Sequence, residues 1–197
     1  LASLAGQVTV ANGAGLSGNG SVGSVVNHGV VASGGQTGNL GVTGNLANAA
    51  DGVLALTVSS PDATPLVIGG TATLGGGLQV NSLAPFTGNA VYSLITAGGG
   101  ITGTFATTNL PAYAFYNTSL LYDANQVTLA VSRNGSSFVD VAATGNQRRL
   151  ASALLRNGAA GDTLRNEILN LDTAGVRAAY DSLSGEIHAS TASAILE

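Results

Sequence analysis

The 197-residue sequence predicts a mainly β fold, a solenoid of short strands, followed by a C-terminal α-helical segment. The first observation behind this prediction is charge. Residues 1–132 carry only Asp51, Asp62 and Asp123, whereas residues 133–197 carry thirteen charged side chains. The second is periodicity, because apolar residues alternate along much of the first part and recur at helical spacing after Arg133. About a quarter of the residues in an ordinary globular domain are charged, so the first part is unlike such a domain.

Residues 1–59 are expected to form the last regular coils of the solenoid. Short apolar runs are separated here by Gly and Asn, which supply the positive φ angles that sharp turns need. Examples of the turns are Asn12-Gly13, Asn27-His28-Gly29 and Gly44-Asn45. The apolar positions are Val8, Val10, Val22, Val25, Val26, Val30, Val31, Leu40, Val42 and Leu46.

From Gly52 onward the strands lengthen and alternate more cleanly, which indicates one buried and one exposed face. The alternating positions are Leu54, Leu56, Val58, Leu66, Ile68, Ala72, Leu74, Leu78, Val80, Tyr92, Leu94, Val127, Leu129 and Val131. Many short strands are compatible with a sandwich, a barrel or a solenoid. Small outward residues favour the solenoid, since closed sheets guard their edges with Lys and Glu. Weak self-similarity between residues 38–40 and 44–46 points the same way.

Residues 60–132 are expected to close the end of the solenoid. A last coil exposes unpaired backbone groups and an apolar interior, so it needs a cap. No aromatic residue occurs before Phe86, whereas this region is rich in them. We expect Phe105, Tyr113, Phe115 and Tyr122 to form the folding cap, with the rings of Phe105 and Tyr122 buried.

Residues 133–197 are expected to be a helical linker. Leu150, Leu154 and Leu155 predict an amphipathic helix over residues 146–156. A second helix is predicted over residues 163–171 behind an Asp162 cap, and a third, capped by Asp172 or Thr173, includes Val176, Ala179 and Leu183. A final helix from Gly185 has a face of mostly small residues, suited to a confined channel: Ile187, Ser190, Thr191, Ala194 and Ile195.

The composition argues against several classes of function. The net charge is −4 and Lys is absent, whereas nucleic-acid binding demands clustered basic residues. No Cys is present to form a disulfide or a thiolate site, which also suits a chain that crosses a narrow pore in extended form. The chain begins at Leu1 without a signal-like segment, so we expect a piece of a longer protein.

Four segments, in order, resemble bacterial autotransporters of type Va. They read GTATLGGGL at 70–78, YSLITAGGGITGTF at 92–105, YDANQVTL at 122–129 and LSGEIHAS at 183–190. The resemblance implies a right-handed parallel β-helix whose C-terminal end, residues 60–132, is an autochaperone junction. It also implies that residues 133–197 lead to a β-barrel beyond Glu197, with the pore helix beginning at Ser184. Some autotransporters cleave themselves between paired Asn residues in that helix. No Asn follows Asn170, so this activity does not carry over.

The function implied by the resemblance is non-catalytic. The chain would promote folding and outer-membrane translocation of an upstream passenger, and it would lie at the outer membrane or cell surface, or be secreted after processing. Its partners would be that passenger, its own barrel and the outer-membrane assembly machinery, with no cofactor, metal or nucleic acid. Two alternatives stay open: an adhesin β-helix, and a stalk that presents an upstream subtilisin-like protease.

The two histidines are interpreted as structural. His28 falls in a turn, where a solvated side chain is expected, and His188 lies beside Glu186, where a polar contact in the pore is expected. The many serines are not accompanied by a nucleophile-elbow motif. Residues 1–132 also lack the clustered acids and basic residues of pectin-cleaving β-helices.

Overall fold

The computed structural model describes residues 2–59, 64–82, 86, 88–156 and 162–184. Their contacts define two compact units. The strand unit contains residues 1–111 and 118–131, and the helical unit contains residues 112–117 and 132–197. The mainly β fold with C-terminal helices that the sequence predicts is therefore confirmed. The pore-helix face, from Ile187 to Ile195, and His188 lie outside the described residues.

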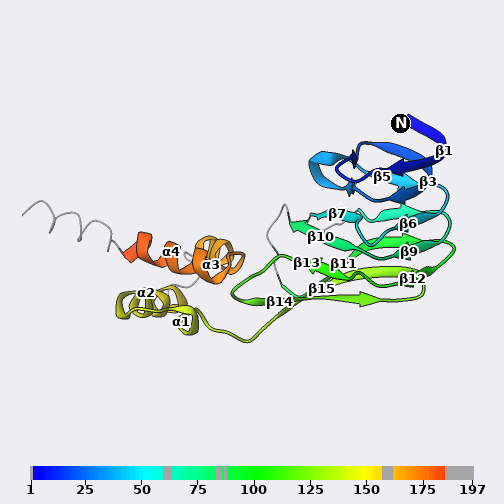
Figure 1. Ribbon diagram of the computed structural model, residues 1–197. Coiled ribbons are helices and arrows are strands. Elements are labelled where there is room, and N and C mark those ends of the chain that lie inside the picture. Colours follow the sequence, from blue (N-terminus) through cyan, green and yellow to red (C-terminus); the bar gives the residue numbers. More distant parts are fainter. Residues whose placement is uncertain (1, 60–63, 83–85, 87, 157–161, 185–197) are drawn as a thin grey trace, which may run out of the picture. The chain divides into compact units, whose positions relative to one another are not determined.

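The strands follow one another from the N-terminal end of the strand unit, which is blue in Figure 1, to its green end. Their bounds are β1 (Ala2–Val10), β2 (Gly15–Leu16), β3 (Gly20–Asn27), β4 (Val30–Ser33), β5 (Leu40–Val42), β6 (Leu46–Asn48), β7 (Val53–Val58), β8 (Leu66–Ile68), β9 (Ala72–Leu74), β10 (Gly77–Ser82), β11 (Ala90–Ala97), β12 (Ile101–Gly103), β13 (Thr107–Asn109), β14 (Tyr116–Tyr122) and β15 (Gln126–Arg133). A 3₁₀ turn covers Gly35–Thr37.

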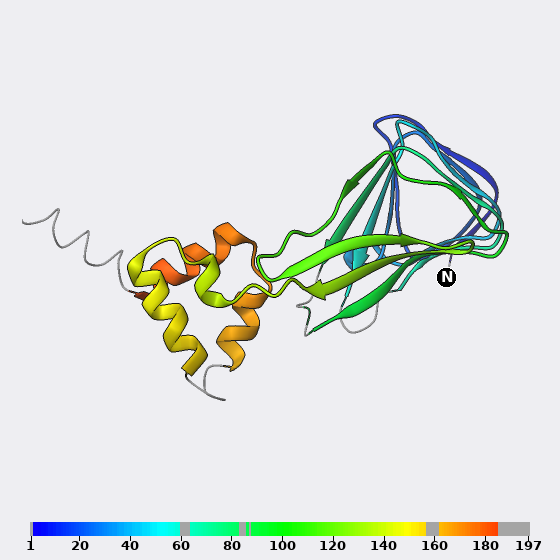
Figure 2. The same ribbon diagram turned by 90° about the horizontal axis from the view of Figure 1, so that it is seen from below.

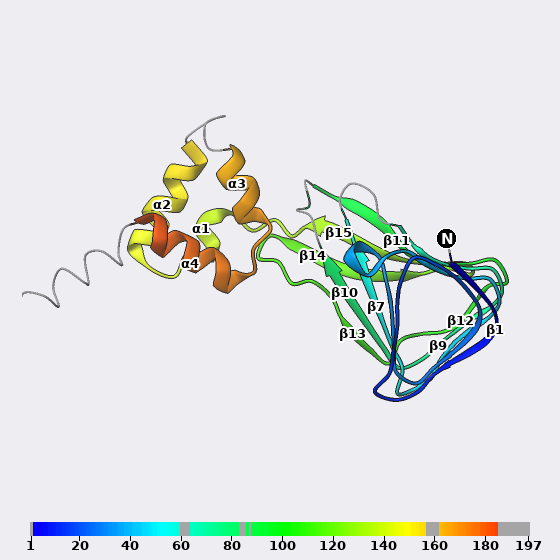
Figure 3. The same ribbon diagram turned by 90° about the horizontal axis from the view of Figure 1, so that it is seen from above.

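The strands form two curled sheets. One has the order β12-β9-β6-β3-β5-β8-β11-β15-β14, with β1 also paired to β3, and the other has the order β13-β10-β7-β4-β2. Strand β3 pairs with β5 through its first half and with β6 through its second, so the larger sheet bends there. Gly15 pairs with Val30 and Gly77 with Thr107, so partners lie 15 residues apart at one end of the smaller sheet and 30 at the other. Figures 2 and 3 show the successive parallel strands layered over one another.

The core of the strand unit consists of columns of apolar side chains from successive layers. Val22, Val42, Ile68 and Ala97 form one such column, since each is paired with the next and all are buried. A second column joins Val31, Leu54 and Leu78 in the smaller sheet. Fully burying a Val or Leu side chain contributes about 1.5–3 kcal/mol, so these columns supply the main attraction between layers.

Close stacking of the layers requires glycine at some corners. Gly76 has φ of 55°, and a Cβ atom there would clash with the carbonyl oxygen of Gly52 in the preceding layer. A Cβ atom at Gly52 would in turn clash with the carbonyl oxygen of Asn27. The abundance of Gly in these turns therefore reflects both backbone conformation and close approach.

The helical unit contains α1 (Phe138–Val141), α2 (Gly145–Arg156), α3 (Asp162–Leu169) and α4 (Thr173–Ser184). Ser137 and Asp140 form a capping box at α1, and the hydrogen bonds from Ser137 lower the pKa of the Asp140 carboxyl. Thr144 accepts from the Gln147 amide at α2, and Asp172 accepts from the Gly175 amide at α4. A helix is present at each of the three predicted places, and α1 is an addition to them. Helix α3 differs in its bounds, because it ends at Leu169 rather than at residue 171 and its first residue is Asp162, the predicted cap.

The buried face of α2 differs from the predicted one. Gln147, Ala151 and Leu154 are buried, whereas Leu155 is 51% exposed. The small side chain of Ala151 is fully buried on the face of α2 that packs in the helical unit, and Leu155 lies beside this face. On α4, Val176 and Tyr180 are fully buried, whereas Leu183 of the same predicted helix is 46% exposed. Ile168 of α3 and Phe138 of α1 are buried in the same unit.

Candidate functional site

The candidate site is the end of the parallel ladder in the larger sheet. Strand β11 pairs in parallel with β8 on one side and antiparallel with β15 on the other. Strand β14 then lies beyond β15. The parallel order thus ends in an antiparallel hairpin, which satisfies the backbone groups that β11 would otherwise leave unpaired on that side.

The turn of this hairpin is hydrogen-bonded to the corner between β11 and β12. The Ala97 amide donates to the Asn125 carbonyl at 2.9 Å, and the Asn125 side chain returns a bond to the Ala97 carbonyl at 2.8 Å. The Ile101 amide donates to the Ala124 carbonyl at 2.7 Å. The hairpin is therefore fixed at its turn as well as along β15.

Apolar side chains of the hairpin and of the neighbouring strand β11 are buried. Val127, Leu129 and Val131 of β15 are buried, as is Ile95 of β11. The Phe86 and Tyr92 rings lie 5.2 Å apart between centroids and are also buried. The last layer is consequently the most aromatic part of the strand unit.

The four predicted cap residues fall into two groups. Phe105 and Tyr122 lie in the strand unit with ring centroids 6.4 Å apart. Phe105 is 8% exposed, but Tyr122 is 37% exposed, so the expectation that both rings are buried is wrong for Tyr122. Tyr113 and Phe115 lie in the helical unit. The sequence alone carries no signal for this separation, because all four rings fall within one short aromatic region.

Within the helical unit the aromatic residues form a second cluster. The Phe115 ring is fully buried, 4.9 Å from that of Phe138, and Tyr113 meets Tyr116 edge-on at 6.2 Å. The Arg133 guanidinium lies 5.7 Å from the Phe115 ring centre and 5.2 Å from that of Tyr116. Such contacts between a cation and aromatic rings are typically favourable by about 0.5–2 kcal/mol.

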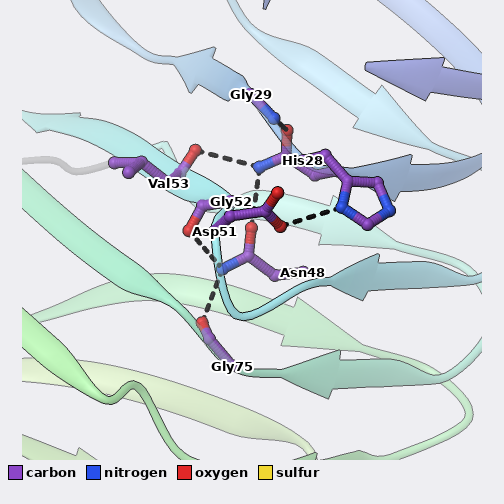
Figure 4. A network of polar contacts seen from close by, with 8 residues as sticks. His28, Gly29, Asn48, Asp51, Gly52, Val53 and Gly75 are labelled. Carbon is purple, nitrogen blue, oxygen red and sulfur yellow. Dashed lines mark hydrogen bonds and ion pairs between the residues drawn. The ribbon is translucent and has the colours of Figure 1, made fainter. Parts of the chain in front are cut away.

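A buried polar corner joins three successive layers of the strand unit (Figure 4). The Asn27 side-chain amide donates to Asn48 Oδ1 at 2.7 Å and to the Val53 carbonyl at 3.0 Å, while its oxygen accepts from the Gly29 amide. Asn48 donates to the carbonyls of Gly52 and Gly75. Both amides are therefore satisfied, as buried polar groups must be.

His28 and Asp51 form an exposed pair next to this corner. His28 Nδ1 lies 2.8 Å from Asp51 Oδ1, and the side chains are 43% and 48% exposed. The hydrogen bond from His28 lowers the pKa of the Asp51 carboxyl. His28 does lie in a turn with a partly solvated side chain, but sequence reasoning missed its partner. The signal that could have found it is the spacing of 23 residues, close to the separation of the neighbouring Asn27 and Asn48.

The rest of the described structure offers little further chemistry. Over residues 2–59, 64–82, 86, 88–156 and 162–184, no three His, Cys, Asp or Glu side chains gather as a metal would require. In the same part of the chain, no helix is long and apolar enough to cross a membrane.

Comparison with known proteins finds a partial similarity. Over 77 residues, 39% of this chain, the sequence is 35% identical to an extracellular serine protease of Serratia marcescens. The match covers 7% of that protein, so the chain corresponds to a small part of its length. No protein-family model matches the chain.

Proposed function

We propose that the chain is a non-catalytic part of a type Va autotransporter that promotes folding and outer-membrane translocation of an upstream passenger. In this proposal the two curled sheets are the last coils of a right-handed parallel β-helix. The observation that carries it is the conversion of the parallel ladder at β11 into an antiparallel hairpin. Two further observations support an autotransporter. The chain is similar to an extracellular protein, and four of its segments resemble autotransporter segments and occur in the same order.

The hairpin suits a folding nucleus because the pairing of β14 with β15 is local. These two strands are joined by residues 123–125, whereas paired residues lie up to 30 apart in the parallel ladder and 30–41 apart between β11 and β15. Hairpins form in about 1–10 μs, while pairing across longer loops has a larger entropy cost. Once β15 and β11 are in place, β11 presents a free edge on which β8 and then β5 can pair in parallel. The sheet would then grow toward the N-terminus. Folding of the passenger outside the cell would therefore favour outward movement of the chain.

In the full protein, residues 60–132 would act as the autochaperone junction. Residues 133–183 would be the helical linker, and the pore helix would begin at Ser184. The partners would be the protein's own β-barrel and the outer-membrane assembly machinery, and the location would be the cell surface. The name of the Serratia marcescens relative favours a second candidate function, a stalk that presents an upstream serine protease.

Surface display of the full-length protein tests the proposal. Phe105→Ala removes a buried ring from the last layer, whereas Val91→Ala changes a β11 side chain that is 65% exposed. We expect Phe105→Ala to lower the fraction of passenger accessible on intact cells, with the barrel still inserted, and Val91→Ala to leave display unchanged. Unchanged display of a Phe105→Ala protein whose purified 197-residue chain is measurably destabilised would contradict a folding role.

A further inference from the structure

The helical unit is built from two separate pieces of the chain. Residues 112–117 follow β13 and include the first two residues of β14, yet they belong to the helical unit by their contacts. Their central side chain, Phe115, is fully buried there, with its ring against Phe138. The helices after residue 132 therefore complete their core with a residue that precedes the hairpin.

Backbone hydrogen bonds hold this segment on two sides. The Asn134 amide donates to the Phe115 carbonyl at 3.1 Å, and the Asn134 side chain donates to the Ala114 carbonyl at 3.0 Å. The Ala114 amide donates to the Leu171 carbonyl, between α3 and α4, at 2.9 Å. The segment is thus bonded both to the chain just after β15 and to the connection between α3 and α4.

Contacts between helices extend this attachment through the unit. Tyr180 of α4 donates its hydroxyl to the Phe138 carbonyl at 2.9 Å, and Arg177 donates to the Val141 carbonyl at 3.0 Å. Both acceptors lie in α1, whose Phe138 packs on Phe115. Loss of α4 would therefore remove support from the residues that hold segment 112–117.

We propose that the helical unit is a conformational latch for the β14–β15 hairpin. By joining Ala114 and Phe115 to Asn134, it closes the open end of the hairpin as one loop of residues 115–134. Closing that loop removes conformational freedom from the unpaired chain, so the folded hairpin is favoured. When the latch opens, the hydrogen bonds between Asn134 and residues 114 and 115 are lost, and β15 separates from β11 more readily. The ladder then gains an exposed edge.

Native-state hydrogen exchange on the 197-residue chain tests the latch. Val176→Ala weakens the core of α4 at a fully buried position, and Leu155→Ala is the control at an exposed one. We expect Val176→Ala to accelerate exchange of the β15 amides about tenfold, equivalent to 1.4 kcal/mol, together with those of α4. Exchange in β4 and β7 should be unaffected, and Leu155→Ala should change neither set. Faster exchange in α4 with unchanged exchange in β15 would overturn the proposal.

Exchange in the unmodified chain provides a test that needs no variant. With increasing urea below the unfolding transition, amides that open together converge on one opening free energy. The latch predicts that β15 amides converge with those of α4. Convergence of β15 with β4 and β7, and not with α4, would show that the hairpin opens independently of the helices. This result would leave the proposed folding role of the strand unit intact.

Discussion

Asn48 makes three of the five hydrogen bonds of the polar corner, as Asn27 does. It accepts from Asn27 and donates to the carbonyls of Gly52 and Gly75, so its replacement removes three hydrogen bonds at a buried position. The Gly52 carbonyl keeps the bond from the Gly77 amide and Asn27 keeps its bond to the Val53 carbonyl, whereas the Gly75 carbonyl loses its side-chain donor. We expect Asn48→Ala to lower the free energy of unfolding of the strand unit by about 1–3 kcal/mol. The exposed Asn109 provides the control, and Asn109→Ala should stay within about 0.5 kcal/mol of the unmodified chain. Equal urea midpoints for the two variants would contradict this role.

Because Tyr180 is buried, we expect the free energy of unfolding of the helical unit to decrease at alkaline pH. Burial raises its pKa to about 12, whereas an unfolded tyrosine titrates near 10. Below about pH 10 the tyrosine is protonated in both the folded and the unfolded chain, so Tyr180 makes its full contribution to the free energy of unfolding. Between pH 10 and 12 the unfolded chain loses the proton first, so stability falls as pH rises.

Tyr180→Phe should reduce this dependence. We expect a loss of about 1 kcal/mol at pH 7, from the missing hydrogen bond to the Phe138 carbonyl, and a shallower fall above pH 10. Urea unfolding followed by helix circular dichroism at pH 8, 10 and 11 measures both effects. A fall of the same steepness in the variant would show that Tyr180 is not the responsible group.

At the scale of elements, the two predicted cap rings that lie in the strand unit should contribute unequally to its stability. Phe105 is 8% exposed and Tyr122 is 37% exposed, although they contact each other. We expect Phe105→Ala to cost about 3–5 kcal/mol, as for other buried rings. Tyr122→Ala should cost about 1 kcal/mol, typical of point substitutions in general. Thermal or urea unfolding of both variants checks the difference, and equal losses would mean that the hairpin turn is more buried in solution.

The elements also show which parts of the fold can be predicted from sequence. Alternation at Leu54, Leu56 and Val58 was sufficient for β7, and helical spacing with an Asp172 cap was sufficient for α4. Helix α1 is only four residues long, too short for a period, but the spacing of Ser137 and Asp140 was a capping signal.

The composition of the candidate site could not be predicted in the same way. Phe115 packs on Phe138, 23 positions away in sequence, and Asn27 bonds to Asn48 across a layer. Local propensity does not specify such long-range pairs. The turn at residues 123–125 is local, but its bonds to Ala97 and Ile101 depend on how the layers stack.

At the scale of the whole molecule, the sites that trypsin can cleave are distributed unevenly along the chain. Trypsin cleaves only after Lys and Arg, and residues 1–132 contain neither. Cleavage at Arg156, which is exposed on α2, therefore reports on the helical unit alone. A protease that cleaves beside apolar residues, such as thermolysin, reports on the strand unit. The two enzymes together separate the stability of the units without any substitution.

Thermolysin digestion in rising urea should leave a core that overlaps residues 60–132. The reason is the unequal protection of the two ends of the strand unit. At the N-terminal end, β1 pairs with β3 alone, and residues 3–7 are exposed. At the other end, β11 is paired on both sides and covered by the buried residues of β15. Mass spectrometry of the surviving fragments identifies the core. A core confined to residues 1–59 would mean that stability is concentrated in the regular layers, and the hairpin could not then be the folding nucleus.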